Sequence, residues 1–136
     1  MFPITTNRAG FICLAFPDVC KTPTPGGEVP IPYPNVGQFS QAEQVSEDVF
    51  VGGKAVVTEA SYIDPTTGDE PGTGGGVVDA GKHMDQATFE PPTSREVYVN
   101  GQRVVCMFDS TKQNGENARG TVLGGEPTVL VGGGGA

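Results

Sequence analysis

The sequence predicts an almost entirely β fold of short hairpins, with at most one short helix. The first reason is its 21 Gly and 12 Pro among 136 residues, because in a helix interior Gly costs about 1 kcal/mol and Pro about 3 kcal/mol relative to Ala. The second is a repeated Val-rich pattern that alternates around a two-residue turn, as β-hairpins do. We expect one domain over residues 1–136, with its core at about 12–131 and a flexible glycine tail at 132–136.

The repeat has the form V-x-V-x-G-x-x-V-V. Its first copy covers residues 49–57, with Gly52 and Gly53 at the turn. Its second covers 97–105, with Asn100-Gly101 at the turn. A type I′ turn needs positive φ at both central residues, and Asn-Gly and Gly-Gly adopt that conformation most readily. Two tight hairpins are therefore predicted.

A looser third copy covers Thr121 to Val129, with Gly124 and Gly125 at its turn. Three similar hairpins in one chain predict an approximate threefold arrangement of the fold. Val-rich hairpins can also resemble one another by chance in a β protein, so this alternative stays open.

A proline-rich segment runs from Pro17 to Pro34 and cannot form regular helix, since each proline lacks an N–H group and fixes φ. We expect extended backbone on a surface or at a sheet edge. Within it, apolar and proline residues alternate, which turns the apolar side chains the same way. Two interpretations remain, a lid over the core or an edge that contacts a partner. The partner-binding candidates are Pro30, Ile31, Pro32, Tyr33 and Pro34.

One helix is predicted at residues 41–48, because Ser40 and Glu43 have the spacing of a capping box. A glycine-rich loop follows at Asp64 to Gly76, where the backbone must visit positive φ or approach another backbone closely.

The formal net charge of -8 argues against nucleic acid and against stable association with anionic membranes, because such a field repels phosphate groups. No apolar run reaches the length of about 20 residues that a transmembrane helix needs. The best apolar run, Gly10 to Phe16, lacks the basic flank and the cleavage site of a signal peptide. We expect a cytoplasmic protein in the producing cell.

Nothing in the sequence predicts catalysis. A hydrolytic site needs a nucleophile and a base, and the one histidine, His83, lies in a polar stretch without a recognisable partner. Gly76, Gly81 and Lys82 approach the spacing of a phosphate-binding loop, but His83 stands where that loop needs Ser or Thr. We expect no enzyme and no catalytic residue.

Three cysteines and one histidine have the right number for a tetrahedral zinc site. No C-x-x-C pair brings them together in the sequence, so buried free thiols are the preferred interpretation. No cofactor is expected. Cys20, Cys106 and His83 stay as candidate ligands, with Cys13 as a possible fourth, if zinc binds.

Four segments together resemble one family. They are AFPDVCKTPTPGGEVPIPYPN at 15–35, VGGKAVV at 51–57, ASYIDPTTGDEPGTGGGVV at 60–78 and VNGQRVV at 99–105. Over roughly residues 12–114 the chain resembles the PAAR-like, PIPY-containing family of bacterial spike tips. The resemblance implies a small β-rich cone that caps and sharpens the trimeric VgrG spike of a type VI secretion system, a contractile injection machine.

The resemblance further implies one tip per VgrG trimer, an effector or adaptor carried by the tip, and outward delivery. In the family, histidines after the second hairpin join a cysteine in binding zinc near the apex. Here those positions hold Met107 and Gln113, which puts zinc in doubt although Cys20 is retained. Because the chain ends soon after the domain, a free-standing tip is expected. The alternatives are a delivery domain excised from a longer toxin effector and a small zinc-binding module.

Overall fold

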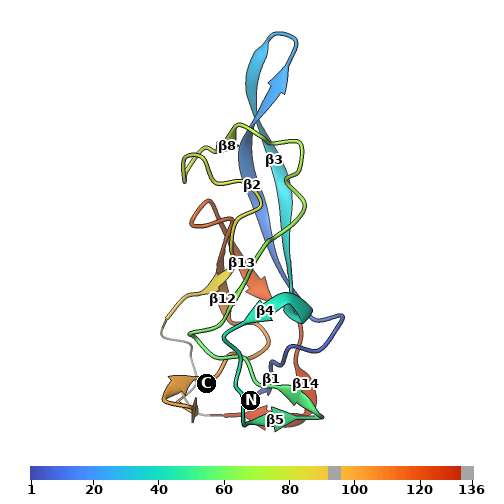
Figure 1. Ribbon diagram of the computed structural model, residues 1–136, viewed down its shortest axis with the longest axis vertical. Helices are drawn as coiled ribbons and strands as arrows, with labels where there is room; N and C mark the ends of the chain where they lie inside the picture. The colour runs from blue at the N-terminus through green and yellow to red at the C-terminus, as the bar shows by residue number, and fades with distance from the viewer. Residues whose placement is uncertain (92–95, 133–136) are drawn as a thin grey trace.

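The computed structural model describes residues 1–91 and 96–132, and Figure 1 shows an elongated molecule that tapers from a broad base to one projecting hairpin. The predicted all-β fold is confirmed, because the helical structure in these ranges is one 3-10 turn at Phe39–Gln41. Within the described chain, no helix is long and apolar enough to cross a membrane. Residues 133–136 of the predicted glycine tail lie outside the described residues.

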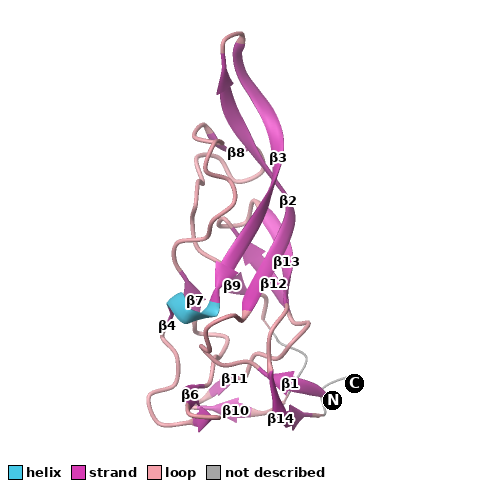
Figure 2. Ribbon diagram, turned by 90° about the vertical axis from the view of Figure 1, so that its right-hand side faces the viewer, coloured by secondary structure: helices cyan, strands magenta, loops and turns pink. Residues whose placement is uncertain are grey.

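A long twisted ribbon forms the tapering end of the molecule (Figure 2). Strand β2 (Ile12–Thr24) and strand β3 (Gly27–Gln38) pair antiparallel from Ile12 and Gln38 up to Thr24 and Gly27. The register shifts between Ala15 and Asp18, which marks an irregularity in the ladder. The upper part of the ribbon extends beyond the rest of the fold, so it forms the apex.

The prolines of β3 are explained by its place at the edge of the six-stranded sheet. Five of its strands follow the order β3-β2-β13-β12-β9, and the sixth, β8, pairs with β2. Pro30, Pro32 and Pro34 occupy alternate positions of this edge strand. A proline cannot donate a ladder hydrogen bond, so it fits where its nitrogen faces away from the neighbouring strand. The three proline side chains are exposed, whereas Ile31 and Tyr33 are half-buried.

Short strands complete the sheet and the middle of the molecule. Strand β13 pairs with both β2 and β12, β9 pairs with β12, and β8 pairs with the upper part of β2. Strands β4 and β7 form a separate two-stranded pair. The bounds are β4 (Ala42–Glu43), β7 (Tyr62–Ile63), β8 (Gly75–Gly76), β9 (Thr88–Phe89), β12 (Ser110–Gln113) and β13 (Ala118–Val122).

Two apolar clusters form the core. The larger one lies between the ribbon and the base, where the rings of Phe39 and Phe89 stack with centroids 5.9 Å apart. Its buried members are Cys13, Phe39, Val57, Ile63, Ala87, Phe89, Val105 and Val122. The smaller one lies within the base and contains Ile4, Val56, Val104, Cys106 and Val131.

Two predictions about these segments are wrong. Residues 41–48 form no helix, because Ala42–Glu43 pair with Tyr62–Ile63 and Gln44 has a φ of 59°. Tertiary strand pairing here overrides the local capping signal. The core also begins before residue 12, since Ile4 is buried in the smaller cluster and Thr5 is fully buried.

Candidate functional site

Among the described residues, the base of the molecule (Figures 1 and 2) contains three antiparallel strand pairs. The first pair joins β5 (Phe50–Val51) and β6 (Lys54–Ala55). The second joins β10 (Tyr98–Val99) and β11 (Gln102–Arg103). Both turns have positive φ at both central residues, at Gly52-Gly53 and at Asn100-Gly101. The third pair joins β1 (Phe2–Ile4) and β14 (Glu126–Val131).

A closed ring of backbone hydrogen bonds links the three pairs. Val57 N–H donates to Thr5 O at 3.1 Å, Thr5 N–H to Val105 O at 2.9 Å, and Val105 N–H to Val57 O at 3.0 Å. Each of three separate segments therefore donates to one neighbour and accepts from the other. This cyclic pattern is the signature of an approximate threefold axis.

A second ring repeats the pattern two residues away in each segment. Asn7 N–H donates to Ala55 O, Glu59 N–H to Arg103 O, and Met107 N–H to Pro3 O, at 2.9 to 3.0 Å. Residues 3–7, 55–59 and 103–107 therefore occupy equivalent positions around the approximate threefold axis.

The third pair differs from the predicted third hairpin, because it is built from the two ends of the chain. Phe2 pairs with Val131 and Pro3 with Leu130, so Val129, Leu130 and Val131 take the place of the first strand of a hairpin. The corresponding second strand begins at Phe2. The fold therefore closes its threefold arrangement by joining the N-terminal and C-terminal strands.

The prediction that Gly124 and Gly125 form a hairpin turn is wrong. Neither residue has a positive φ, and both lie between β13 and β14. A Cβ atom on Gly124 would lie 2.6 Å from the Phe11 side chain, and one on Gly125 would lie 2.6 Å from Pro3 Cβ. Glycine is needed at both positions because Phe11 and Pro3 approach them closely. The Gly-Gly pair therefore resembles a hairpin signal in the sequence although it forms no turn.

The three strand pairs expose apolar side chains at equivalent positions. By the strand registers, Phe50, Tyr98 and Leu130 correspond to one another, and their exposed fractions are 56%, 56% and 52%. The preceding residues also correspond and are also exposed, namely Val49, Val97 and Val129. We call these six residues the basal apolar set.

An ion pair fixes the C-terminal strand to the base. Arg8 Nε and Thr6 Oγ1 both donate to Glu126 Oε2 at 2.7 Å, and Arg8 Nη2 donates to Gly52 O at 2.8 Å. Burial opposes ionisation of Glu126, but the hydrogen bonds from Arg8 and Thr6 and the charge of Arg8 lower its pKa. The contact ties β14 to the turn of the first hairpin.

We expect the substitution Glu126→Ala to destabilise the fold by about 1–2 kcal/mol, because Thr6 then loses its buried acceptor while half-exposed Arg8 is partly compensated by water. Urea denaturation measures this change. Because the pKa of Glu126 is lowered in the fold, its stabilisation is present at neutral pH and is lost as pH falls below about 4.5. Equal unfolding curves for both proteins at pH 7 would contradict this role.

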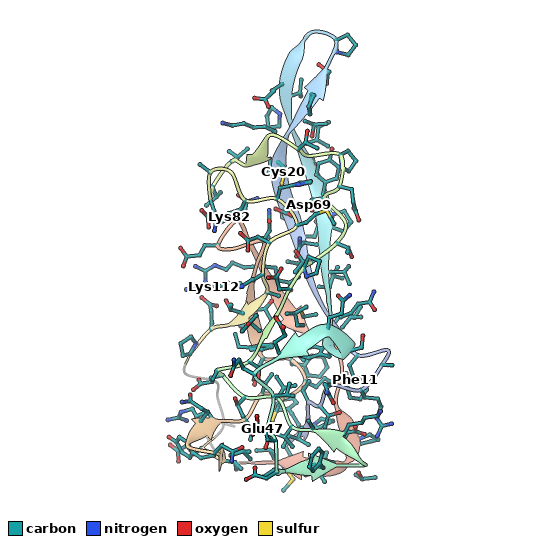
Figure 3. The ribbon with its side chains drawn as sticks, viewed as in Figure 1. Phe11, Cys20, Glu47, Asp69, Lys82 and Lys112 are labelled. Atoms are coloured by element: carbon teal, nitrogen blue, oxygen red, sulfur yellow. The ribbon has the colours of Figure 1, made fainter. Side chains whose placement is uncertain are left out.

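A second cluster of functional groups lies at the other end of the body, below the projecting ribbon. Figure 3 places Cys20 and Asp69 there, far from Glu47 near the base. One oxygen of Asp18, the Cys20 Sγ atom and one oxygen of Asp69 lie within 4.8 Å of one another, and all three residues are buried. Burial raises the pKa of the Cys20 thiol to about 12, and the charges of Asp18 and Asp69 add to this effect.

The chain matches the toxin PAAR-like domain over residues 11–120. It is a member of this family. The PAAR-like domain is 34% identical over 108 residues to the DNase toxin Tse7 of Pseudomonas aeruginosa, a match that covers 74% of this chain. It spans only 27% of the length of that relative. No solved structure matches the chain.

The predicted partner-binding residues Pro30 to Pro34 lie on β3 of the PAAR-like domain, in the upper ribbon and away from the basal apolar set. The Tyr33 hydroxyl is hydrogen bonded to Thr22 Oγ1 at 2.8 Å. A contact between this segment and a partner stays a prediction.

The predicted zinc ligands are not brought together. Cys106 lies in the smaller apolar cluster, and Cys13 lies in the larger one. His83 Nε2 is 3.0 Å from the carbonyl oxygens of Asp69 and Glu70. Among the described residues, the one group of three candidate ligands is Asp18, Cys20 and Asp69, and it contains a single member of the predicted set.

This trio does not fit zinc well, because its remaining neighbours present N–H groups rather than ligand atoms. Asn114 Oδ1 accepts from Asp85 N–H, and Asn117 Oδ1 accepts from Val78 N–H and from Asp79 N–H. These bonds fix both amides with their NH₂ groups toward the trio. A tetrahedral zinc site needs a fourth lone pair, which neither amide supplies.

Sequence reasoning missed the basal apolar set and the buried trio. A sequence signal for the basal apolar set exists, because Val129-Leu130-Val131 repeats the pattern of Val49-Phe50-Val51. Its partner strand, however, lies at the opposite end of the chain. Asp18 and Cys20 lie two residues apart on β2, but Asp69 comes from a glycine-rich loop whose path the sequence does not specify.

Proposed function

We propose that this PAAR-like domain caps a trimeric spike protein of the VgrG type, in a type VI secretion system, with one domain seated on three spike chains. The observation that carries this proposal is the threefold ring of backbone hydrogen bonds in the base. A symmetric trimer presents three identical surfaces around an axis, and a single chain matches them only if it repeats similar surfaces around its own axis.

The basal apolar set supports the choice of the base as the contact surface. Monomeric proteins rarely expose large contiguous apolar patches without a partner, and aromatic residues carry much of the binding energy of interfaces. Phe50 and Tyr98 are exposed aromatics at equivalent positions, and Leu130 completes the set. Short strands at the base can also extend the sheets of a partner by strand addition.

The domain would deliver an effector rather than act as an enzyme. The family description names toxins, and the relative Tse7 is a DNase toxin of which this domain spans 27%. We infer that the remaining part of such a protein carries the toxic activity, and that this domain is made in the cytoplasm and delivered outward with the spike. The tapering ribbon at the opposite end would then be the leading point.

A second candidate role is that of a delivery domain in a longer toxin chain, and the partial coverage of Tse7 favours it. Both roles would use the same contact surface between the base and the spike. Sequencing the reading frame beyond Ala136 distinguishes them, because a delivery domain is followed by a further coding segment. A small zinc-binding module is disfavoured, since the predicted ligands lie apart.

We expect the purified domain to form a stable complex with its trimeric spike and none with a monomeric fragment of that spike. Size-exclusion chromatography with mass measurement should give one domain per three spike chains, since the base already contains three similar surfaces. A ratio of three to three would contradict the proposed seat, because it would place one domain on each spike chain.

A further inference from the structure

A pocket of about 360 Å³ lies in the base, between the segment that precedes the first hairpin and the turn of the second hairpin. Ser46, Asp48 and Asn100 are among its lining residues. Glu47 also lines it, and Figure 3 shows this residue near the base. Ligand pockets begin at about 300 Å³, so the pocket is large enough for one long side chain.

The threefold equivalence places this pocket where Arg8 lies in another part of the base. Extending the equivalent segments 3–7 and 55–59 by one residue matches Arg8 with Ala60, which lines the pocket. The hairpin registers likewise match Gly52 with Asn100, the first residue of each turn. Arg8 Nη2 donates to Gly52 O at 2.8 Å, whereas the methyl group of Ala60 has nothing to donate. The pocket is therefore a copy of the Arg8 site without its arginine.

The acceptor side of the Arg8 site also has a counterpart in the pocket. Ile4 pairs with Glu126 in the third strand pair. Its equivalent Val56 accepts a hydrogen bond from Ser46 N–H at 2.9 Å, so Ser46 corresponds to Glu126. Serine carries no charge, but Oδ1 of Asp48 lies 3.2 Å from Ser46 Oγ. The pocket thus has a carboxylate close to the position that Glu126 occupies beside Arg8.

A hydroxyl group in the pocket lacks the partner that its equivalent has. Thr6 Oγ1 donates to Glu126 Oε2 at 2.7 Å. The equivalent Thr58 is 5% exposed and lines the pocket, and no described residue is hydrogen bonded to its hydroxyl. Polar groups with so little exposure normally have a hydrogen-bond partner. Because a hydroxyl oxygen accepts from N–H groups, this residue indicates a donor that enters the pocket from outside.

The two sites also differ in charge. Arg8 and Lys54 supply positive charge beside Glu126. In the hairpin registers the neutral Gln102 corresponds to Lys54. The described residues that line the pocket include Glu47 and Asp48 but no lysine or arginine. The pocket therefore carries negative charge without a cation of its own, which favours a cationic ligand.

The third equivalent position holds Phe108, whose ring contacts that of Phe2 edge-on with centroids 5.8 Å apart. The chain thus fills two of the three equivalent positions with its own side chains, and among the described residues only the position at Ala60 is open. This position borders the basal apolar set, because Val49 follows directly after the pocket segment 44–48. A partner seated on the base can therefore reach the pocket.

We propose that the pocket binds the guanidinium group of one arginine side chain of the spike, an inference that rests on the function proposed above. Asp48 and the Asn100 carbonyl accept its N–H groups. Glu126 and Gly52 accept those of Arg8 in the same way. Lysine fits less well, because it lacks the planar fork that reaches two acceptors at once. One spike chain then makes a contact that the other two do not make.

The substitution Ala60→Arg tests the pocket by filling it from within the chain. It should weaken spike binding by about 10–100-fold, because the spike arginine loses its charge-assisted hydrogen bonds. Ala80→Arg adds the same charge in the exposed segment after β8 and should bind as the wild type does. Surface plasmon resonance measures both affinities, and urea unfolding with at least the wild-type midpoint shows that the variant folds. Wild-type affinity of Ala60→Arg would overturn the proposal.

A second measurement uses a small probe, so that failure of the pocket and failure of the contact between base and spike can be told apart. N-acetyl-arginine methylamide is titrated into the ¹⁵N-labelled domain. It should give saturable shifts of the Asn100 and Gln102 side-chain amides that are absent in Ala60→Arg and weaker with the lysine analogue. Absence of such shifts in the wild type would overturn the pocket. Saturable shifts in a domain that does not bind the spike would instead overturn the proposed function and the spike as the source of the arginine.

Discussion

Replacing Phe50, Tyr98 and Leu130 together with aspartate should weaken binding to a trimeric spike by more than about 1,000-fold, since a single interface hot spot can contribute about 2 kcal/mol or more. All three side chains are more than half exposed at equivalent positions of the base. Their replacement removes apolar contact area and introduces three charges that the interface would have to desolvate. Surface plasmon resonance on an immobilised spike measures the change.

The matched controls carry the same substitution at exposed apolar residues away from the base. Phe16→Asp and Val78→Asp alter side chains that are 64% and 76% exposed, on β2 and in the loop after β8. Both variants should bind as the wild type does. The variant Ile31→Asp with Tyr33→Asp tests the upper ribbon separately, and loss of binding there with normal binding of the basal variant would move the contact to the ribbon.

Removing the last strand, by ending the chain after Gly125, should abolish cooperative unfolding of the base. The deletion takes away Val131, which is 5% exposed in the smaller apolar cluster, together with the pairing to β1 and the Glu126 contact to Arg8. Burial of one valine contributes about 1.5–3 kcal/mol, and the lost pairing adds to it. The sum is a large part of the total of about 5–15 kcal/mol typical of domains. Differential scanning calorimetry measures the loss.

A circular permutant is the control that separates closure of the base from mere loss of residues. Joining residue 131 to Phe2 through a short glycine linker, and opening the chain between Gly52 and Gly53, keeps every strand and turns the split pair into a true hairpin. Because Phe2 and Val131 are already paired, this protein should fold and bind the spike. A truncated chain that melts cooperatively at the wild-type temperature would show that the third pair is dispensable.

The sequence by itself determined the elements whose signals are local. Its Gly and Pro content excluded long helices, and the alternation of Pro30, Ile31, Pro32, Tyr33 and Pro34 indicated extended edge backbone. The glycine and Asn-Gly pairs marked the first two turns, because positive φ is a property of the residues that occupy it. The four matching segments identified the family, which the comparison over residues 11–120 confirms.

Only the tertiary structure decided how the distant parts close. Residues 2–4 and 126–131 pair because Ile4 and Val131 pack together in the smaller apolar cluster. No local sequence pattern indicates a pairing between segments so far apart in the chain. The capping signal at Ser40 forms no helix, because Ala42–Glu43 pair with Tyr62–Ile63. Tertiary packing of these strands outweighs a helix cap worth about 1 kcal/mol. The buried trio likewise depends on the loop that carries Asp69 folding over β2, which brings the carboxyl groups of Asp18 and Asp69 beside the Cys20 thiol.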